Sequence, residues 1–215
     1  MIAYDRRGYE SSQHVTAVPD LETQVADLHS VIEVMAGGGP VDVFGHSMGG
    51  SIAITSAIFN PMGMRSVVTY ESPLRWLLEE EDWWVPAPSP EEEAETFFSM
   101  MTSPGSWERL NETERAHRRA DGCALVADLQ MSRREIPFGV EELSELKVPL
   151  IMGLGGGTDI TRFSETADIV TGATKKAELV IVPDLVHGAH LRTPDALATF
   201  LIDALGRCEQ IGVNA

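Results

Sequence analysis

Short apolar runs alternate with segments of helical periodicity along much of the chain. Apolar residues recur at helical spacing over residues 21–36, and Asp20 precedes them at a cap position, so a helix is predicted there. Residues 41–44 are mostly β-branched or aromatic and predict a buried parallel strand, and residues 48–59 predict the helix after it. Residues 65–70 predict the next strand.

The same rhythm returns near the end of the chain. Strands are predicted over residues 148–154 and 178–182, and helices over about 160–171 and 195–206. A further short strand is predicted at residues 1–5. Strands and helices in this order imply a parallel sheet with right-handed crossovers, which is an α/β fold with helices on both faces.

The middle of the chain has a different character. Residues 74–145 hold all four tryptophans and clustered acids, and they show no strand alternation. A helix starts at SPEEE, residues 89–93, whose acids are interpreted as solvated, and a longer helix is predicted over about 112–134. We therefore predict an α/β core of residues 1–73 and 146–215 with a helical lid inserted at 74–145.

The sequence GHSMG, residues 45–49, fits the G-x-S-x-G motif and stands between a predicted strand and a predicted helix. At such a corner Ser47 is expected in a strained backbone conformation, with Gly45 and Gly49 small because the turn packs them together. The N–H of Met48 would point at a developing oxyanion from a helix N-terminus, which favours negative charge. The motif therefore predicts a nucleophilic serine.

A serine hydroxyl needs a base to remove its proton. His187 is the candidate, because it lies on a loop soon after the predicted strand at 178–182. His190 is interpreted as a structural hydrogen-bonding residue, and without a third ligand in view no metal site is predicted. His46 occupies the variable position of the motif and is given no proton-transfer role.

The base in turn needs a carboxylate to orient it, and two candidates stay open. Asp159 follows the strand at 148–154, where the chain order Ser, Asp, His would place it, although Gly155–Gly157 suggest a long and loose loop there. Its alternative role is a helix cap. Glu71 ends the strand at 65–70 and could reach the same imidazole.

Taken together, the segments DRRGYESS, GHSMGG, YESPLRWL and HGAHLRTPDAL resemble the α/β-hydrolase superfamily, in its serine esterase and haloperoxidase-like branch, over nearly the whole chain. The resemblance implies an α/β-hydrolase fold with a mostly parallel sheet flanked by helices. In some members the triad acid follows the sixth strand, which favours Glu71. Haloalkane dehalogenases use an aspartate nucleophile where this chain has Ser47, so dehalogenation is disfavoured.

The departure from that family is at the front, where the chain starts at what resembles the fourth strand. An N-terminally truncated fold is therefore expected, without the HG-type loop that supplies the second oxyanion donor. One lost donor can cost about 10²–10³ in rate. The open sheet edge would also favour a homo-oligomer.

Composition narrows the partners. The formal net charge of −17 disfavours nucleic acid and anionic membranes, so a small-molecule substrate is expected. Two distant cysteines and no visible signal peptide predict a cytoplasmic protein, and no cofactor is expected.

The hypothesis from sequence is a serine hydrolase that cleaves a small, apolar ester or related acyl compound through an acyl-enzyme. Trp76 and Trp84 of the lid are the predicted substrate-binding residues. The alternative is a non-catalytic or weakly active ligand-binding protein on the same fold, impaired by the missing oxyanion loop.

Overall fold

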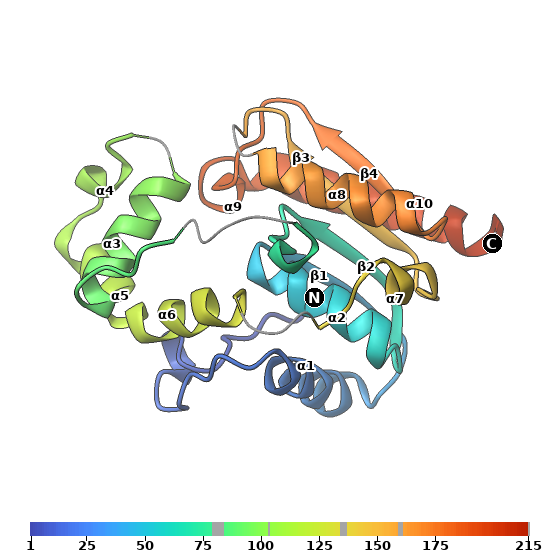
Figure 1. Ribbon diagram of the computed structural model, residues 1–215, viewed down its shortest axis with the longest axis horizontal. Helices are drawn as coiled ribbons and strands as arrows, with labels where there is room; N and C mark the ends of the chain where they lie inside the picture. Colours follow the sequence, from blue (N-terminus) through green and yellow to red (C-terminus); the bar gives the residue numbers. More distant parts are fainter. Residues whose placement is uncertain (79–83, 103, 134–136, 159–160, 215) are drawn as a thin grey trace. The chain divides into compact units, whose positions relative to one another are not determined.

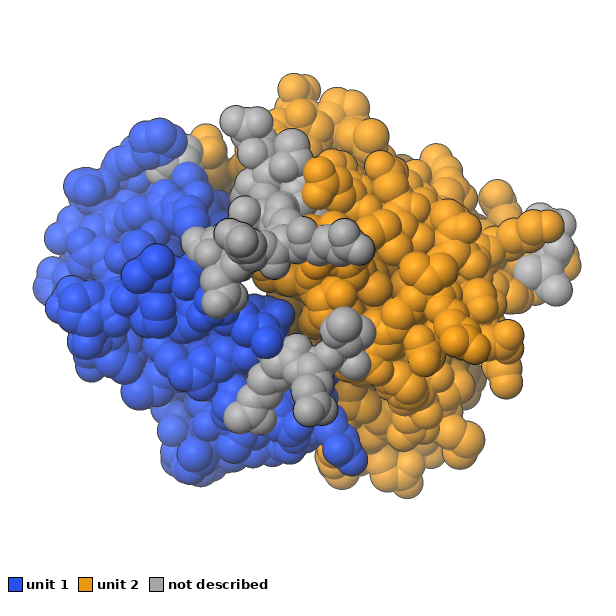
Figure 2. Space-filling model, viewed as in Figure 1, with its two compact units in different colours: residues 1–24, 80–134 blue, residues 25–79, 135–215 orange. Residues whose placement is uncertain are grey.

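The computed structural model describes residues 1–78, 84–102, 104–133, 137–158 and 161–214. The chain divides into two compact units: residues 25–79 with 135–215, and residues 1–24 with 80–134 (Figure 2). The N-terminal segment thus belongs with the helical middle of the chain. The borders predicted from the sequence, a core of residues 1–73 and 146–215 and a lid of residues 74–145, stay a prediction.

The larger unit, residues 25–79 and 135–215, is built on a parallel sheet of four strands among its described residues, in the order β1-β2-β3-β4 (Figure 1). The strands are β1 (Val41–His46), β2 (Met64–Tyr70), β3 (Leu150–Gly155) and β4 (Ala177–Val182). His46 pairs with Tyr70, and Tyr70 pairs with Gly153, so the carboxyl ends of three strands lie in register. This confirms the predicted α/β class.

The described residues of the larger unit also form six helices and one 3₁₀ turn. They are α1 (Leu21–Ala36, whose first four residues precede the unit), α2 (Met48–Phe59), α7 (Val140–Ser144), α8 (Thr161–Ala173), α9 (Ala189–Arg192) and α10 (Pro194–Asn214), with the 3₁₀ turn η2 (Arg75–Leu77). Because β1 to β2 and β3 to β4 step across the sheet in the same direction, right-handed crossovers put α2 and α8 on one face. Helix α10 packs on the other face, where Phe200 lies among buried Val68, Tyr70 and Ile151.

The smaller unit is helical. Its elements are η1 (Glu10–Ser12), α3 (Pro90–Met101), α4 (Ser106–Arg109), α5 (Glu112–Ala120) and α6 (Gly122–Met131). Helix α3 starts where the Ser89 side chain accepts the N–H of Glu92, and α5 starts with a capping box between Asn111 and Glu114. These local signals explain where the helices begin.

Asp128 of α6 joins the N-terminal segment to the helices of this unit. Both guanidinium nitrogens of Arg6 donate to its carboxylate, and the Tyr9 hydroxyl donates to Oδ2 at 2.7 Å. The Arg6 guanidinium also lies 4.9 Å from the centroid of the Tyr9 ring. Burial and the Asp128 charge raise the pKa of Tyr9 well above its ordinary value, so the hydroxyl stays a donor.

Several predicted elements are confirmed, two of them residue for residue. Helices α1 and α2 have the predicted bounds, and Asp20 accepts the N–H of Thr23 at 2.9 Å as the cap of α1. Helix α10 continues to Asn214, well past the predicted end. No helix in the described part of the chain combines the length and apolarity needed to span a bilayer.

Three predictions about local structure are wrong. Residues 1–5 form no strand, because no strand of the sheet pairs with them and Arg6 is bound to α6 instead. The helix predicted over 112–134 breaks at Asp121, which ends α5 and starts α6. Glu93 is not solvated: it is 3% exposed and accepts the Trp84 indole N–H and the Ala87 N–H, each at 2.7 Å.

Candidate active site

Ser47 lies at the sharp turn from β1 into α2. Its backbone has φ 52° and ψ −125°, an uncommon conformation for a residue with a side chain. Its N–H donates to the Tyr70 carbonyl at 2.9 Å, which attaches the turn to the end of β2. Met48 is the first residue of α2, where a helix leaves its N–H groups without intrahelical acceptors. The strained corner predicted from the sequence is therefore present.

The predicted need for small residues is confirmed at one of the two glycines of the motif, Gly45, and not at the other. A Cβ on Gly45 would lie 2.3 Å from the Gly49 carbonyl oxygen, so no larger residue fits there. A Cβ on Gly49 would meet nothing within 4 Å, which contradicts the predicted need for a small residue at that position. The second crowded position is Gly50, where a Cβ would lie 1.8 Å from the Ser72 hydroxyl.

Glu71 follows β2 directly and is the carboxylate that meets His187. Its side chain is buried, and its Oε2 lies 2.8 Å from Nδ1 of His187. Its other oxygen, Oε1, accepts the N–H of Gly155 at 2.9 Å and the hydroxyl of Thr158. Both oxygens of the buried carboxylate are thus hydrogen-bonded, which is what a buried charge requires. Asp159, the other sequence candidate, lies outside the described residues.

The loop that carries His187 is held tightly. The Tyr70 hydroxyl donates to the Val186 carbonyl at 3.1 Å, and the Gly157 N–H donates to the Leu185 carbonyl at 2.9 Å. A Cβ on Gly155 would lie 2.2 Å from that same Leu185 oxygen. Gly155 at the end of β3 and Gly156 and Gly157 after it therefore allow close packing against the His187 loop. The predicted looseness is wrong for residues 155–158, and residues 159–160 lie outside the described residues.

Two further rings contact the imidazole of His187. The buried Phe163 of α8 stacks on it, with ring centroids 5.1 Å apart and planes 7° apart. His46 lies 4.6 Å from it, tilted by 43°. The sequence offers no signal for Phe163, which looks like any apolar helix residue, and it assigns His46 no proton-transfer role.

His46 is an uncharged histidine beside the base. Burial lowers its pKa to about 3, and the neighbouring His187 and His190 contribute in the same direction. Its Nε2 is buried and has no hydrogen-bond partner in the described structure. The ring of His190 lies 4.7 Å from it, so His190 reaches the site through His46.

The sheet register places Ser47 and Glu71 at the ends of neighbouring strands. His46 pairs with Tyr70, so Ser47 and Glu71 follow neighbouring strands, whose spacing in a sheet is about 4.8 Å. No hydrogen bond joins the Ser47 hydroxyl to His187 within the part of the chain that is described.

The two predicted substrate-binding tryptophans have different surroundings. Trp76 packs edge-on against Phe138 at 5.3 Å, and its indole N–H is buried without a partner among the described residues. Trp84 is buried within the smaller unit, where Glu93 accepts its N–H and Arg133 lies 5.1 Å from its ring centroid. Their roles toward a substrate stay predictions.

Among the described residues, no three His, Cys, Asp or Glu side chains lie close enough together to hold a metal ion.

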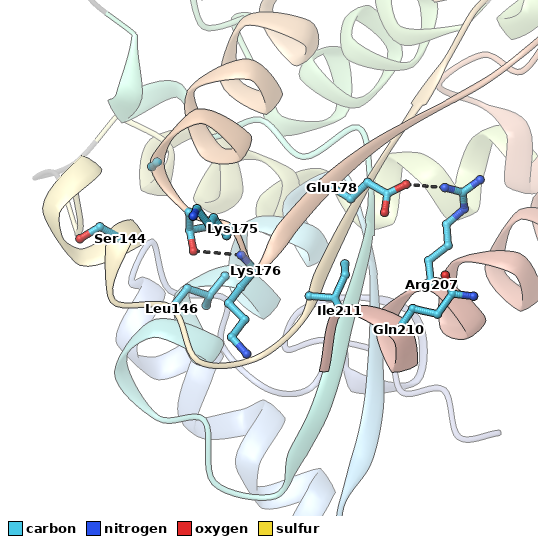
Figure 3. Close-up of a pocket in the computed structure, with 10 residues that line it drawn as sticks. Ser144, Leu146, Lys175, Lys176, Glu178, Arg207, Gln210 and Ile211 are labelled. Carbon is cyan, nitrogen blue, oxygen red and sulfur yellow. Dashed lines mark hydrogen bonds and ion pairs between the residues drawn. The ribbon is translucent and has the colours of Figure 1, made fainter. Parts of the chain in front are cut away.

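A cavity of about 770 Å³ lies at the opposite end of the sheet, before the starts of β3 and β4 (Figure 3). Lys175, Lys176 and Arg207 line it, and Arg207 pairs with Glu178. This cavity is separate from Ser47, which follows a carboxyl strand end.

A family model matches most of the chain. A model described as the alpha/beta hydrolase family matches residues 1–200, and the chain belongs to that family. Its members are in general hydrolases. No curated protein sequence matches the chain significantly.

Solved structures show the same fold at low sequence identity. A bromoperoxidase from Bacillus anthracis has a TM-score of 0.71 and 18% identity, over 94% of this chain and 80% of that one. A hydrolase from Pseudomonas aeruginosa PA01 has a TM-score of 0.70 and 18% identity, over 94% and 78%. An enol-lactonase from Burkholderia xenovorans LB400 has a TM-score of 0.70 and 18% identity, over 94% and 79%.

Proposed function

We propose that this chain is a serine hydrolase that cleaves a small, apolar ester or related acyl compound through an acyl-enzyme. The observation that carries the proposal is the buried Glu71–His187 pair, 2.8 Å apart, at the strand end beside Ser47. A carboxylate on Nδ1 is the arrangement that lets an imidazole act as a base through Nε2.

In this mechanism the Ser47 hydroxyl oxygen attacks the acyl carbon while His187 Nε2 accepts the hydroxyl proton. Glu71 holds the tautomer with the proton on Nδ1 and stabilises the imidazolium that forms. The N–H of Met48, at the start of α2, stabilises the oxyanion. His187 then gives its proton to the leaving group, and water attacks the acyl-enzyme with His187 again as the base.

The proposed substrate class comes from the aromatic side chains predicted to bind it and from one structure with the same fold. The sequence predicts Trp76 and Trp84 as substrate-binding residues, and their aromatic side chains favour an apolar acyl compound. An enol-lactonase with this fold suggests that a cyclic ester should be tested beside open-chain esters. The lactone carbonyl would undergo the same attack by Ser47.

The test is turnover of short-chain nitrophenyl esters and labelling by a fluorophosphonate probe, each compared with Ser47→Ala. We expect turnover and labelling in the unchanged protein and neither in the variant, because the variant lacks the attacking oxygen. A thermal unfolding curve for both proteins serves as the control for folding.

Equal turnover by the two proteins would remove Ser47 from the mechanism. A folded protein that neither labels nor turns over any ester would support the alternative, a non-catalytic ligand-binding protein.

A further inference from the structure

Phe163 lies in the first turn of α8 and is 5% exposed. Its ring is nearly parallel to the imidazole of His187, and the centroids are 5.1 Å apart. This separation lies within the 4.5–7 Å over which offset-stacked aromatic pairs attract each other. The ring face of Phe163 therefore covers part of one face of the imidazole.

A single hydrogen bond does not fix an imidazole. The contact of Nδ1 with Glu71 Oε2 holds one corner of the ring, and the ring can still tilt through small changes of its side-chain torsions. Such a tilt would turn the lone pair of Nε2 away from Ser47. A flat buried side chain stacked on the ring opposes this turn, because any tilt would force the two rings into each other.

The charges around the imidazole point to a second effect of the same ring. Among the described residues, Glu71 at the end of β2 is the carboxylate in contact with it. His46 at the end of β1 faces it as an uncharged ring, and His190 of α9 stands behind His46. Tyr70 contacts the loop through its hydroxyl and not the imidazole. A cation over the face of a phenyl ring is stabilised by the ring quadrupole.

We propose that Phe163 is a positioning residue for His187: its ring keeps the imidazole plane aimed at Ser47 and favours the imidazolium that forms when Ser47 loses its proton. This inference rests on the proposed serine hydrolase function. It adds a residue of α8 to a site otherwise built from strand ends and the loop after β4.

The central variant is Phe163→Leu, which keeps an apolar side chain and removes the ring face. We expect kcat for a nitrophenyl ester to fall about 3- to 10-fold with KM nearly unchanged, because the stack acts mainly on the transition state. The acidic limb of kcat/KM against pH should move to lower pH, because the imidazolium has lost a favourable neighbour. Phe163→Tyr, which keeps the ring face, should restore most of kcat and the pH profile.

The matched control is Phe200→Leu. Phe200 is 4% exposed, lies in the same unit and makes no ring contact with His187. It should lose similar stability without the change in pH profile. Equal effects of the two leucine variants on kcat and on the profile, or no rescue by tyrosine, would overturn the proposal.

A substrate-free measurement keeps the inference separate from the proposed function. In isotope-labelled protein, the Nδ1–H proton of His187 should give a protected signal that broadens in Phe163→Leu and persists in Phe200→Leu and Phe163→Tyr. If no variant turns over esters, the proposed function fails while this signal still tests the stack. A signal unaffected by Phe163→Leu would reject the positioning role.

Discussion

Two non-glycine residues with left-handed backbone stand side by side at the ends of β1 and β2. Ser47 has φ 52° and Glu71 has φ 49°. Such conformations cost about 1–3 kcal/mol each and persist only where surrounding contacts hold them. Ser47 is held by the bond from its N–H to the Tyr70 carbonyl, and Glu71 by the three hydrogen-bond partners of its carboxylate. Strain at both positions marks them as functional candidates.

At this scale we predict that Glu71→Gln lowers kcat for a nitrophenyl ester about 10³–10⁴-fold, as loss of the orienting carboxylate does in a serine triad. Gly155 and Thr158 both donate to Oε1, so the glutamine oxygen should turn to them. Its NH₂ group then faces Nδ1 of His187 and forces the wrong tautomer. Asp159→Asn is the matched control and should retain most of the activity; the reverse pattern would make Asp159 the acid.

At the scale of elements, the residues after β3 are hydrogen-bonded to the end of β4 and to the loop that follows it. The N–H groups of Gly156 and Gly157 donate to the carbonyls of Val182 and Leu185, both at 2.9 Å. The position of His187 therefore depends on the loop after β3, although that loop contributes no atom to the proposed proton transfer.

We predict that Gly155→Ala destabilises the protein by about 1–3 kcal/mol, because its Cβ would lie 2.2 Å from the Leu185 oxygen and 2.4 Å from the Tyr70 hydroxyl. Probe labelling of Ser47 should slow as the His187 loop shifts. Gly206→Ala is the control: it lies within α10 with nothing near its Cβ, and should gain about 0.5–1 kcal/mol. Urea unfolding of both variants measures the difference in the free energy of unfolding. Equal losses would show that close packing of the two loops at Gly155 does not stabilise the protein.

At the scale of the whole molecule, acid should act on stability through His46. The ordinary histidine pKa is 6.5, and His46 in the folded protein has a pKa of about 3. The unfolded chain therefore binds this proton first, and stability falls as pH drops from about 6.5 toward 3. The slope from this one group reaches up to about 1.4 kcal/mol per pH unit. Its contribution is fully present above pH 6.5.

The measurement is the free energy of unfolding from urea curves between pH 7 and pH 4. His46→Asn should flatten the slope in that range, whatever its effect at pH 7, because the asparagine does not titrate. Exposed His117 supplies the control, and His117→Asn should leave the slope as it is. An unchanged slope in His46→Asn would reject the assignment.

Association through an outer strand of the sheet stays a prediction, to be tested by the oligomeric state.

The sequence by itself determined the order of the four strands of the sheet and of helices α1, α2, α8 and α10, the turn at Ser47 and the loop that carries His187. Those features follow from local periodicity, turn residues and caps, which act over a few neighbouring residues. Only the tertiary structure decided that Glu71 meets His187 across 116 residues of sequence and that Phe163 stacks on the same ring. It also decided that a Cβ would clash at Gly50 and not at Gly49, and that Glu93 is buried. The physical reason is that these contacts join segments distant in the chain, and no local pattern records which side chains packing will bring together.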